Sequence, residues 1–342
     1  MTRYCLPMAG VVMLIVLSTC TTVGSKEKFT HNNEGNKLVG DLLLPSGSGP
    51  HPVVVFNHGD GAIPADAHGY YQPLMDAFVS AGVAILSWDK PGVRRSSGNW
   101  LNQSMQDRAV ELLLMVRLLK QRTDIDSKRV GLWGISQAGW VMPLAVSQSS
   151  EFAFMISVSP AISWQEQSQF LTQSRMASEG YSSSEIADAL ALNEEGIARL
   201  KSDSSYESYL SQVAKAPKCC ASVMDKQRWN FVRLNIDTDA RPSLLQMKIP
   251  VLAIFGENDL NIDVKHSAQT YEHIKTAANN PDVTIRVFDN ADHSLYRSSE
   301  KRLRGAGAAD IWHLIKIGFQ GANAFAPDYI DSTVEWALAR FR

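Results

Sequence analysis

The chain carries one stretch with the pattern of a strand, a tight turn and a helix: Arg129-Val-Gly-Leu-Trp-Gly-Ile-Ser-Gln-Ala-Gly-Trp-Val-Met-Pro-Leu-Ala-Val146. The apolar run 130–133 has the length of a buried strand. Trp140, Leu144 and Ser147 recur at roughly the spacing of a helical turn. Ser136 stands in the turn between them. A serine at a sharp strand-to-helix turn is typical of a nucleophile elbow.

The residues around Ser136 suit the chemistry of such an elbow. Its Oγ must stand clear of the sheet, and small residues two positions before and after it let strand and helix pass closely. Here those residues are Gly134 and Ala138, with Gly139 next. The usual pattern is G-x-S-x-G, so Ala138 departs from it by one methyl group. The alternative is a serine in an ordinary turn, where Ser and Gly are common.

Further strands and helices alternate on both sides of this stretch. Apolar runs bounded by turn residues predict strands at 37–44, 53–56, 83–88, 152–158, 250–255 and 283–288. Helical spacing predicts helices at 70–81, 105–121, 264–277 and 332–341. This alternation favours an α/β fold with a mostly parallel, doubly wound sheet. The predicted core comprises residues 37–162 and 247–342.

The segment 163–246 lacks a convincing strand and is too long for a plain loop in a compact domain. Ser182 and Glu185 have the spacing of a capping box. Ile186, Leu190, Ile197 and Leu200 fall on one face of the helix that this box begins. We therefore expect a helical cap inserted into the core, with charges of both signs mixed through it.

Three residues with catalytic chemistry follow predicted strands, in the order Ser136, Asp259, His293. Catalytic groups of open α/β sheets gather at the carboxyl ends of the strands. A serine needs a base to take its proton, and a histidine base needs a carboxylate on its other nitrogen. The chain order Ser, acid, His agrees with this triad. As alternatives, Asp259 caps a turn and Asp263 is a rival acid, although Asp263 looks more like a helix N-cap.

Other histidines are weaker candidates for the base. His58 lies beside a glycine-rich turn and favours a structural role, whereas His266 and His273 fall on a predicted exposed helix. Their spacing of seven residues spans two helical turns rather than one, so no metal site is predicted. His68 is a further histidine that could serve as the base.

The turn His58-Gly59-Asp60-Gly61 follows the predicted strand 53–56. A turn of this type aims backbone N–H groups at a substrate oxygen. The expected oxyanion hole is formed by the N–H groups of Asp60 and Gln137. Only the backbones of these two residues are needed for that role, so their side chains are expected to matter little.

The chain from Lys37 onward resembles the α/β-hydrolase superfamily, and more narrowly the bacterial esterase and dienelactone-hydrolase-like group. The resemblance is carried by Leu38 to Leu44 with the Pro45–Pro50 turn, by the loop Trp88-Asp89-Lys90-Pro91-Gly92, and by Val130 to Gln137. It implies an eight-stranded sheet and no cofactor. It also implies Ser136 as nucleophile, Asp259 as acid and His293 as base.

The N-terminus has the pattern of an export signal. Arg3 precedes an apolar run, 6–17, which is too short to span a bilayer and suits a signal-peptide core. Leu17-Ser18-Thr19-Cys20 resembles a bacterial lipoprotein cleavage box, with Thr19 as a departure. We expect residues 1–20 to be a signal, Cys20 to be a lipidation site, and 21–36 to be a tether. The expected location is the periplasm, or the membrane through the lipid anchor.

Composition narrows the classes of function. The chain has 342 residues, 45% of them hydrophobic, and a formal net charge of −2. That charge predicts no nucleic-acid partner. The four cysteines, Cys5, Cys20, Cys219 and Cys220, form no CxxC motif. The expected activity is hydrolysis of a carboxylic ester with a small or medium acyl group. A peptidase, an aminopeptidase, a thioesterase and a non-catalytic binding lipoprotein remain alternatives.

Overall fold

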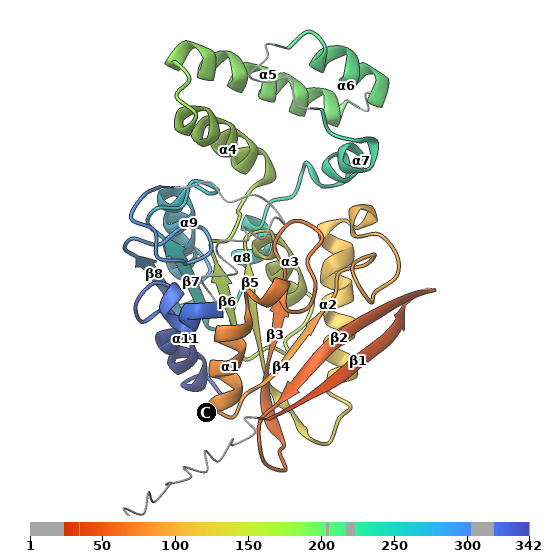
Figure 1. Cartoon of the computed structure of the whole chain (residues 1–342), viewed down its shortest axis with the longest axis vertical. Helices are drawn as coiled ribbons and strands as arrows, with labels where there is room; N and C mark the ends of the chain where they lie inside the picture. Colours follow the sequence, from red (N-terminus) through yellow and green to blue (C-terminus); the bar gives the residue numbers. More distant parts are fainter. Residues whose placement is uncertain (1–23, 34, 203–204, 217–222, 302–317, 342) are drawn as a thin grey trace, which may run out of the picture.

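An eight-stranded sheet forms the centre of the computed structural model, which describes residues 24–33, 35–202, 205–216, 223–301 and 318–341 (Figure 1). The strand order is β1-β2-β4-β3-β5-β6-β7-β8. The strands are β1 (Ser25–Asn33), β2 (Asn36–Leu44), β3 (His51–Asn57), β4 (Ala84–Trp88), β5 (Ile125–Ile135), β6 (Phe154–Val158), β7 (Val251–Gly256) and β8 (Val283–Phe288).

The predicted fold class is confirmed, because the sheet is mostly parallel. From β4 to β8, neighbouring strands all pair in parallel, and only β1 with β2 and β2 with β4 are antiparallel. The inner strands β4, β6 and β7 are buried along their whole length. This explains why their sequences read as continuous apolar runs rather than as alternating patterns.

Helices cover both faces of the sheet and enclose two apolar clusters. The helices α1 and α11 pack on one face, and α2, α3, α8 and α9 pack on the other (Figure 1). These helices are α1 (Gln72–Ser80), α2 (Met105–Leu119), α3 (Ala138–Ser147), α8 (Arg241–Leu244), α9 (Val264–Ala277) and α11 (Tyr329–Leu338). Short 3₁₀ helices within the described residues are η1 (Ala67–Gly69), η2 (Trp100–Asn102) and η4 (Gly321–Ala324).

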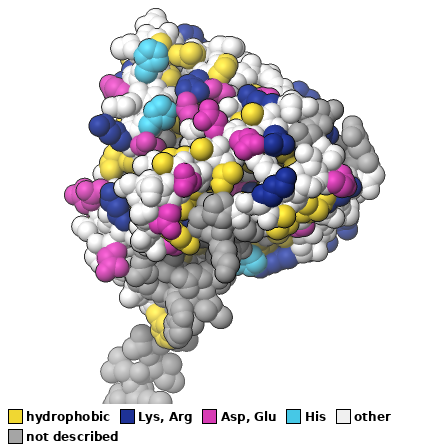
Figure 2. All heavy atoms as spheres, turned by 90° about the horizontal axis from the view of Figure 1, so that it is seen from above, with side chains coloured by type: hydrophobic (Ala, Val, Ile, Leu, Met, Phe, Trp, Pro, Cys, Tyr) yellow, Lys and Arg dark blue, Asp and Glu magenta, His cyan; other side chains and the backbone are white. Residues whose placement is uncertain are grey.

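Further helices in the described part of the chain lie beyond the carboxyl ends of the parallel strands, and we call them the cap (Figure 1). They are α4 (Trp164–Ser178), α5 (Ser183–Lys201), α6 (Tyr206–Val213) and α7 (Lys226–Asn235). The predicted capping box is confirmed, since Ser182 and Glu185 bond to each other's backbone at the start of α5. Viewed from above, the molecule shows cationic and anionic side chains intermingled rather than gathered by sign (Figure 2).

One predicted boundary is wrong. The segment 21–36 was expected to be a tether, but its residues 25–33 form β1, which pairs antiparallel with β2 from Ser25↔Leu44 to Asn33↔Asn36. An edge strand exposes one face and one edge, so it needs few apolar residues, and Phe29 alone packs partly against the core. Lys26 and Lys28 are charged residues of the kind that discourage pairing with a second sheet at such an edge. Residues 1–23, including the expected signal and Cys20, lie outside the described residues.

Among the residues that the structure describes, none of the helices combines the length and the apolar character needed to span a bilayer.

Candidate active site

Ser136 occupies a strained turn between β5 and α3. Its φ is 57°, in the left-handed region that non-glycine residues rarely adopt. The turn is held by backbone hydrogen bonds, because Ser136 N–H donates to Val158 C=O at 2.9 Å and Gly139 N–H donates to Ser136 C=O at 2.8 Å. Such strain costs about 1–3 kcal/mol and persists only where the surroundings enforce it, most often at functional sites.

The glycines around Ser136 are required by close packing. A Cβ on Gly134 would lie 2.6 Å from the Cβ of Ala138, and a Cβ on Gly139 would lie 2.7 Å from Pro160. The glycine at 134 therefore makes the room that Ala138 occupies. This accounts for the departure from G-x-S-x-G, because the two positions face each other and only one of them needs to lack a side chain.

Asp259 and His293 are bonded to each other. Nδ1 of His293 lies 2.7 Å from Oδ2 of Asp259, and both side chains are nearly excluded from solvent. Oδ1 of the same carboxylate accepts the backbone N–H groups of Asn261 at 2.7 Å and Ile262 at 3.3 Å. Since an ionised carboxylate only accepts hydrogen bonds, Nδ1 of His293 is the donor in this bond and carries its proton.

The loops after β7 and β8 are joined side by side, and this brings Asp259 and His293 together. Asn258 N–H donates to Ala291 C=O at 2.8 Å, and Glu257 N–H donates to Phe288 C=O at 3.0 Å. A Cβ on Gly256 would lie 2.3 Å from the carbonyl oxygen of Asp292. Position 256 must therefore be glycine for the two loops to approach this closely.

All three predicted catalytic residues lie at the same edge of the sheet. Ser136 follows β5, Asp259 follows β7, and His293 follows β8 in a parallel array. Ser136 also lines the large pocket described below, together with Asp60 and Gln137. The structure thus brings the five predicted site residues to one edge. Their catalytic roles stay predictions.

The rival residues have other partners. Asp263 accepts the backbone N–H of His266 at 2.9 Å as the N-cap of α9, as its sequence position indicated. His58 is buried, with Nε2 donating to Trp88 C=O at 2.6 Å. Burial, with the nearby charge of Lys90, lowers the pKa of His58 to about 3, so its ring is neutral at ordinary pH.

The turn His58–Gly61 is held from below by a buried lysine. Nζ of Lys90 donates to the carbonyl oxygens of Gly59 at 2.5 Å and Gly61 at 3.0 Å. Lys90 is 2% exposed. Burial, reinforced by the charge of Arg108, lowers its pKa well below the usual value. A cation that takes up two loop carbonyls fixes the orientation of the peptide groups to which they belong.

A second buried cation joins the same turn to the elbow. Arg108 of α2 donates through Nη2 to His58 C=O at 2.8 Å and through Nη1 to the side-chain oxygen of Gln137. Burial lowers the pKa of Arg108, with Glu111 and Asp60 opposing that effect. Arg108 and Lys90 therefore position the two residues whose N–H groups are the expected oxyanion donors.

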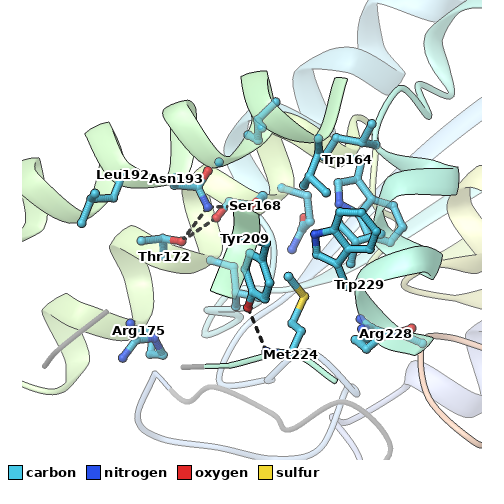
Figure 3. Close-up of a pocket in the computed structure, with 18 of the residues that line it drawn as sticks. Trp164, Ser168, Thr172, Arg175, Leu192, Asn193, Tyr209, Met224, Arg228 and Trp229 are labelled. Carbon is cyan, nitrogen blue, oxygen red and sulfur yellow. Dashed lines mark hydrogen bonds and ion pairs between the residues drawn. The ribbon is translucent and has the colours of Figure 1, made fainter. Parts of the chain in front are cut away.

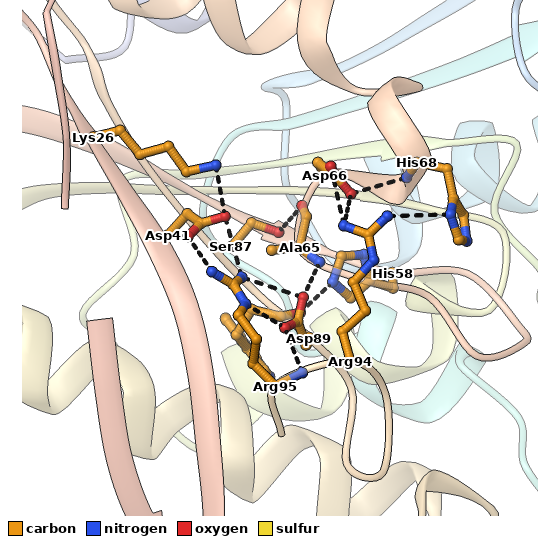
Figure 4. Close-up of polar contacts among 11 residues, drawn as sticks. Lys26, Asp41, His58, Ala65, Asp66, His68, Ser87, Asp89, Arg94 and Arg95 are labelled. Atoms are coloured by element: carbon orange, nitrogen blue, oxygen red, sulfur yellow. Dashed lines mark hydrogen bonds and ion pairs between the residues drawn. The ribbon is translucent and has the colours of Figure 1, made fainter. Parts of the chain in front are cut away.

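The end of the same loop, at Ala65 and Asp66, is held by ion pairs and hydrogen bonds (Figure 4). Arg95 bridges Asp41 on β2 and Asp89 after β4, with N–O distances of 2.7 Å to each. Asp89 accepts the backbone N–H of Ala65 at 2.8 Å. Arg94 pairs with Asp66 at 3.0 Å. Asp89, Arg94 and Arg95 thus hold the loop that carries Asp60 in place.

A pocket of about 520 Å³ extends from Ser136 into the cap. This volume falls within the range of small-molecule sites. Figure 3 shows Trp164 and Trp229 together on one side and Asn193, Ser168 and Thr172 on another. The wall is largely apolar and aromatic, and its members of this kind are Trp140, Ala161, Trp164, Leu171, Ala189, Leu192, Ile197, Leu200, Tyr209, Val213, Ala216, Met224, Trp229, Val232 and Ile236.

A small polar cluster interrupts this wall. Nδ2 of Asn193 donates to Ser168 Oγ at 2.8 Å and lies 3.4 Å from Thr172 Oγ1, joining α5 to α4 (Figure 3). Arg175 and Arg199 also line the pocket, and each pairs with a glutamate on its own helix, Glu179 and Glu195 respectively. The pocket therefore offers a largely apolar surface with a hydrogen-bonding cluster between α4 and α5.

Three residues at the site were not identified from the sequence: Lys90, Arg108 and Arg228. Lys90 lies in the Trp88–Gly92 loop, whose sequence indicated the family resemblance but no role for this lysine. Arg108 falls among the apolar positions of α2, three residues after buried Met105, and that placement of a charge was an available signal. Arg228 forms a bidentate pair with Asp60 across 168 positions of sequence, and no local pattern indicates such a contact.

The side chains of Asp60 and Gln137 are more engaged than expected. Nε2 of Gln137 donates to Oδ1 of Asp60 at 3.0 Å, so the two expected oxyanion donors are linked through their side chains as well. Within the described part of the chain, no group of three or more His, Cys, Asp and Glu side chains is arranged to hold a metal ion.

The chain is similar to several known proteins. The esterase EstD of Thermotoga maritima is 24% identical over 274 residues, which cover 78% of this chain and 60% of that protein. An esterase of Pyrococcus furiosus has a similar structure, with a TM-score of 0.54 at 20% identity, covering 79% of this chain and 84% of that one. The α/β hydrolase GrgF of Penicillium sp. sh18 gives a TM-score of 0.57 at 16% identity, covering 93% and 97%.

The chain spans between 39% and 60% of the lengths of the curated relatives that it matches. The solved structures show the fold that this protein shares with them, which is the α/β-hydrolase fold.

A family model described as serine aminopeptidase, S33 (Hydrolase_4) matches residues 48–300, from the turn before β3 to beyond the loop of His293. This match covers well over half of the chain and supports a hydrolase. The protein therefore belongs to the Hydrolase_4 family of α/β hydrolases.

Proposed function

We propose that this protein is a serine hydrolase that cleaves carboxylic esters of small or medium acyl groups. Ser136 is the nucleophile, His293 the general base and acid, and Asp259 the carboxylate that orients His293. The observation that carries the proposal is the 2.7 Å bond from His293 to Asp259, at the same sheet edge as a serine in a strained elbow. The esterases among the similar proteins support the choice of ester.

The first half of the reaction forms an acyl-enzyme. Ser136 Oγ attacks the ester carbonyl carbon while Nε2 of His293 takes the hydroxyl proton. The carbonyl oxygen becomes an oxyanion, which the N–H groups of Asp60 and Gln137 stabilise. When the tetrahedral intermediate collapses, the C–O bond to the alcohol breaks. His293 then returns its proton to the departing alkoxide oxygen.

The second half repeats these steps with water. His293 takes a proton from a water molecule, whose oxygen attacks the acyl carbon. The resulting oxyanion uses the same two N–H groups. Collapse releases the carboxylic acid, and the proton on His293 returns to Ser136 Oγ. Asp259 keeps its negative charge throughout and stabilises the imidazolium that forms in each half.

Ser136→Ala is the direct test, with p-nitrophenyl butyrate as substrate. We expect kcat to fall by several orders of magnitude, because the nucleophile is lost. Ser147→Ala is the matched control: Ser147 is exposed at the end of α3, and its hydroxyl bonds only to the Leu144 carbonyl in the described structure. Wild-type turnover by Ser136→Ala would refute the proposal.

Aminopeptidase activity is the second candidate, because the family description names it. An aminopeptidase needs a carboxylate for the substrate amine. Among the described residues that line the pocket, Asp60 is the one acidic residue, and Arg228 already holds both of its oxygens. Three arginines line the same pocket. This charge pattern disfavours a substrate with a cationic amine in the pocket. Faster cleavage of aminoacyl p-nitroanilides than of p-nitrophenyl esters would reverse this order.

A thioesterase would use the same residues, and a series of acyl thioesters beside the oxygen esters distinguishes the two. A non-catalytic binding lipoprotein is the third candidate. A fluorophosphonate probe reacts with activated serines, so labelling at Ser136 supports an enzyme, and absence of labelling favours a binding protein. Export, lipidation at Cys20 and residence in the periplasm or at a membrane remain part of this proposal. Globomycin-sensitive processing of the full chain tests them.

A further inference from the structure

Arg228 joins the cap to the turn that carries Asp60. It lies on α7, and its guanidinium binds the Asp60 carboxylate with both nitrogens, Nη1 to Oδ1 at 3.0 Å and Nη2 to Oδ2 at 2.6 Å. The guanidinium carbon also lies 5.0 Å from the ring centre of Phe231 and 5.8 Å from that of Trp100. A planar cation held by a bidentate pair and two rings has little freedom to move.

The Asp60 carboxylate is the junction between this cap residue and the elbow. Its Oδ1 accepts from Gln137 Nε2 at 3.0 Å as well as from Arg228. Gln137 in turn accepts from the buried Arg108. Burial alone would raise the pKa of Asp60, but the hydrogen bonds and charge of Arg228, with the charge of Lys90, lower it below the usual value. The carboxylate is therefore ionised at neutral pH.

The peptide group between Gly59 and Asp60 is held from the opposite side. Lys90 Nζ takes the Gly59 carbonyl oxygen at 2.5 Å. In a trans peptide the N–H points away from the C=O, so the N–H of Asp60 points away from Lys90. The space for a Cβ on Gly59 is bounded by Ser136 Cβ at 3.4 Å, which places this peptide directly beside the elbow. Lys90 from the core thus binds the carbonyl of Gly59, and Arg228 from the cap binds the side chain of Asp60. Together they fix the Gly59–Asp60 dipeptide.

We propose that Arg228 is a positioning residue, which sets the N–H of Asp60 for the oxyanion and makes docking of α7 a condition for a complete oxyanion hole. This inference rests on the proposed function. It predicts that the cap is more than the wall of the acyl pocket. Cap and oxyanion hole form one unit, because the same carboxylate that fastens the cap is attached to the donor peptide.

Removal of Arg228 leaves the Asp60 carboxylate partly buried beside Gln137 without its bidentate partner. A charge in that position is costly, so the turn must rearrange to reach water or Lys90. Rearrangement moves the Asp60 N–H from its place beside Ser136. Since an oxyanion donor acts mainly in the transition state, the loss falls on kcat rather than on KM.

The experiment compares Arg228→Met, Arg228→Lys, Asp60→Asn and the double variant Asp60→Asn/Arg228→Met with p-nitrophenyl butyrate. Turnover is expressed per active site, counted by fluorophosphonate titration, so that unfolded protein does not contribute. Lys226→Met is the matched control, because it removes an exposed positive charge from the first residue of the same helix. Melting temperatures are measured for every variant.

We expect Arg228→Met to lower kcat about 10- to 100-fold, below the loss for deleting a donor outright. KM should change by less than about threefold. Arg228→Lys should have a higher kcat than Arg228→Met, since lysine supplies the positive charge but not the bidentate pair. The double variant should be no worse than the poorer single variant, because both remove one interaction. Lys226→Met should match the wild type.

Two results would overturn the proposal. A rise in KM with unchanged kcat in Arg228→Met would make Arg228 a substrate-binding residue only. Additive losses in the double variant would show that Arg228 and Asp60 act separately. Failure of the proposed function is distinguishable, because Ser136→Ala would then retain activity. If Ser136→Ala is inactive while Arg228→Met keeps its kcat, the positioning role alone is wrong.

Discussion

His293 donates from Nδ1 to Oδ2 of Asp259 at 2.7 Å, while the other oxygen of that carboxylate is occupied by backbone N–H groups. The carboxylate is thus fixed on both sides before any substrate binds. An asparagine at 259 keeps the shape, but its amide would donate to Nδ1 and favour the tautomer with the proton on Nε2. That tautomer cannot accept the proton of Ser136.

Asp259→Asn should therefore lower kcat by about 10³- to 10⁴-fold for p-nitrophenyl butyrate. Asp263→Asn is the control, since Asp263 lies four residues after Asp259 and its carboxylate accepts the backbone N–H of His266 as the N-cap of α9. It should change the melting temperature slightly and leave kcat as it is. Equal losses in the two variants would remove Asp259 from the catalytic assignment.

The contact between the β7 and β8 loops predicts a coupled loss of stability and activity. Gly256→Ala places a Cβ 2.3 Å from the Asp292 carbonyl oxygen, so the two loops must separate and His293 must shift. We expect a cost of about 1–3 kcal/mol in the free energy of unfolding and a fall in kcat.

Gly180→Ala separates these two effects. Gly180 lies at the end of α4 with φ of +84° and open space around its Cβ position. Alanine there costs about 1 kcal/mol through backbone strain alone. Urea unfolding and steady-state kinetics should show lower stability in both variants, but a lower kcat per folded molecule only in Gly256→Ala.

The pH dependence of stability should carry a contribution from His58. Its pKa is about 3 in the folded protein against 6.5 for an ordinary histidine. Between those values the unfolded chain binds a proton that the folded chain does not. The free energy of unfolding is therefore unaffected by His58 above pH 6.5. As the pH drops below that value, protonation of His58 in the unfolded chain lowers the free energy of unfolding by about 1.4 kcal/mol per pH unit.

His58→Gln removes this proton while keeping a side-chain N–H for the Trp88 carbonyl. Urea unfolding at pH 7.0, 6.0 and 5.0 measures the slope for both proteins, above the range where carboxylates titrate. The slope of the free energy of unfolding against pH should be smaller in the variant, by the amount that corresponds to one proton. Parallel curves for wild type and variant would show that His58 takes up a proton in the folded state.

The far wall of the pocket should limit acyl length. Gly196 of α5 lines the pocket, and no atom lies within 4 Å of its Cβ position. Gly196→Leu extends a side chain into this space. For p-nitrophenyl esters from acetate to palmitate, the wild type should show an optimum at short or medium chains. The variant should shift it to shorter chains, with about tenfold lower kcat/KM at the former optimum.

Ala177→Leu places the same leucine side chain at an exposed position of α4 and should leave the chain-length profile in place. A uniform loss across all esters in Gly196→Leu would indicate a general disturbance of the cap. Equal wild-type activity from acetate to palmitate would indicate an open groove instead of a closed pocket.

The sequence predicted the elements whose signals are local. The elbow at Ser136, the N-cap at Asp263 and the capping box at Ser182 depend on residues within a few positions of one another. The strands of the sheet interior were visible because both of their faces are buried. By contrast, β1 was missed because an edge strand needs only Phe29 in the core and otherwise resembles a polar linker.

The contacts around Asp60 depend on distant parts of the chain and leave no local pattern. Its partners Gln137 and Arg228 are 77 and 168 positions away. The sequence predicts the buried charges only in part. Arg108 and Glu111 interrupt the apolar stripe of α2, which indicates that they are unusual but does not indicate which residues they contact. The Asp60 side chain was expected to matter little, whereas the structure gives it three hydrogen-bond donors, the two Arg228 nitrogens and Gln137 Nε2.

The strand β1 also determines how the enzyme is displayed on any support to which its N-terminus is attached. The pocket lies at the carboxyl ends of the parallel strands. Ser25 pairs with Leu44 at the opposite end of the sheet. A lipid at Cys20 would be separated from Ser25 by a chain segment with an extended length of at most ~17 Å. Anchored in this way, to a vesicle or to a resin bead, the domain turns its base to the support and its cap to the surrounding solution.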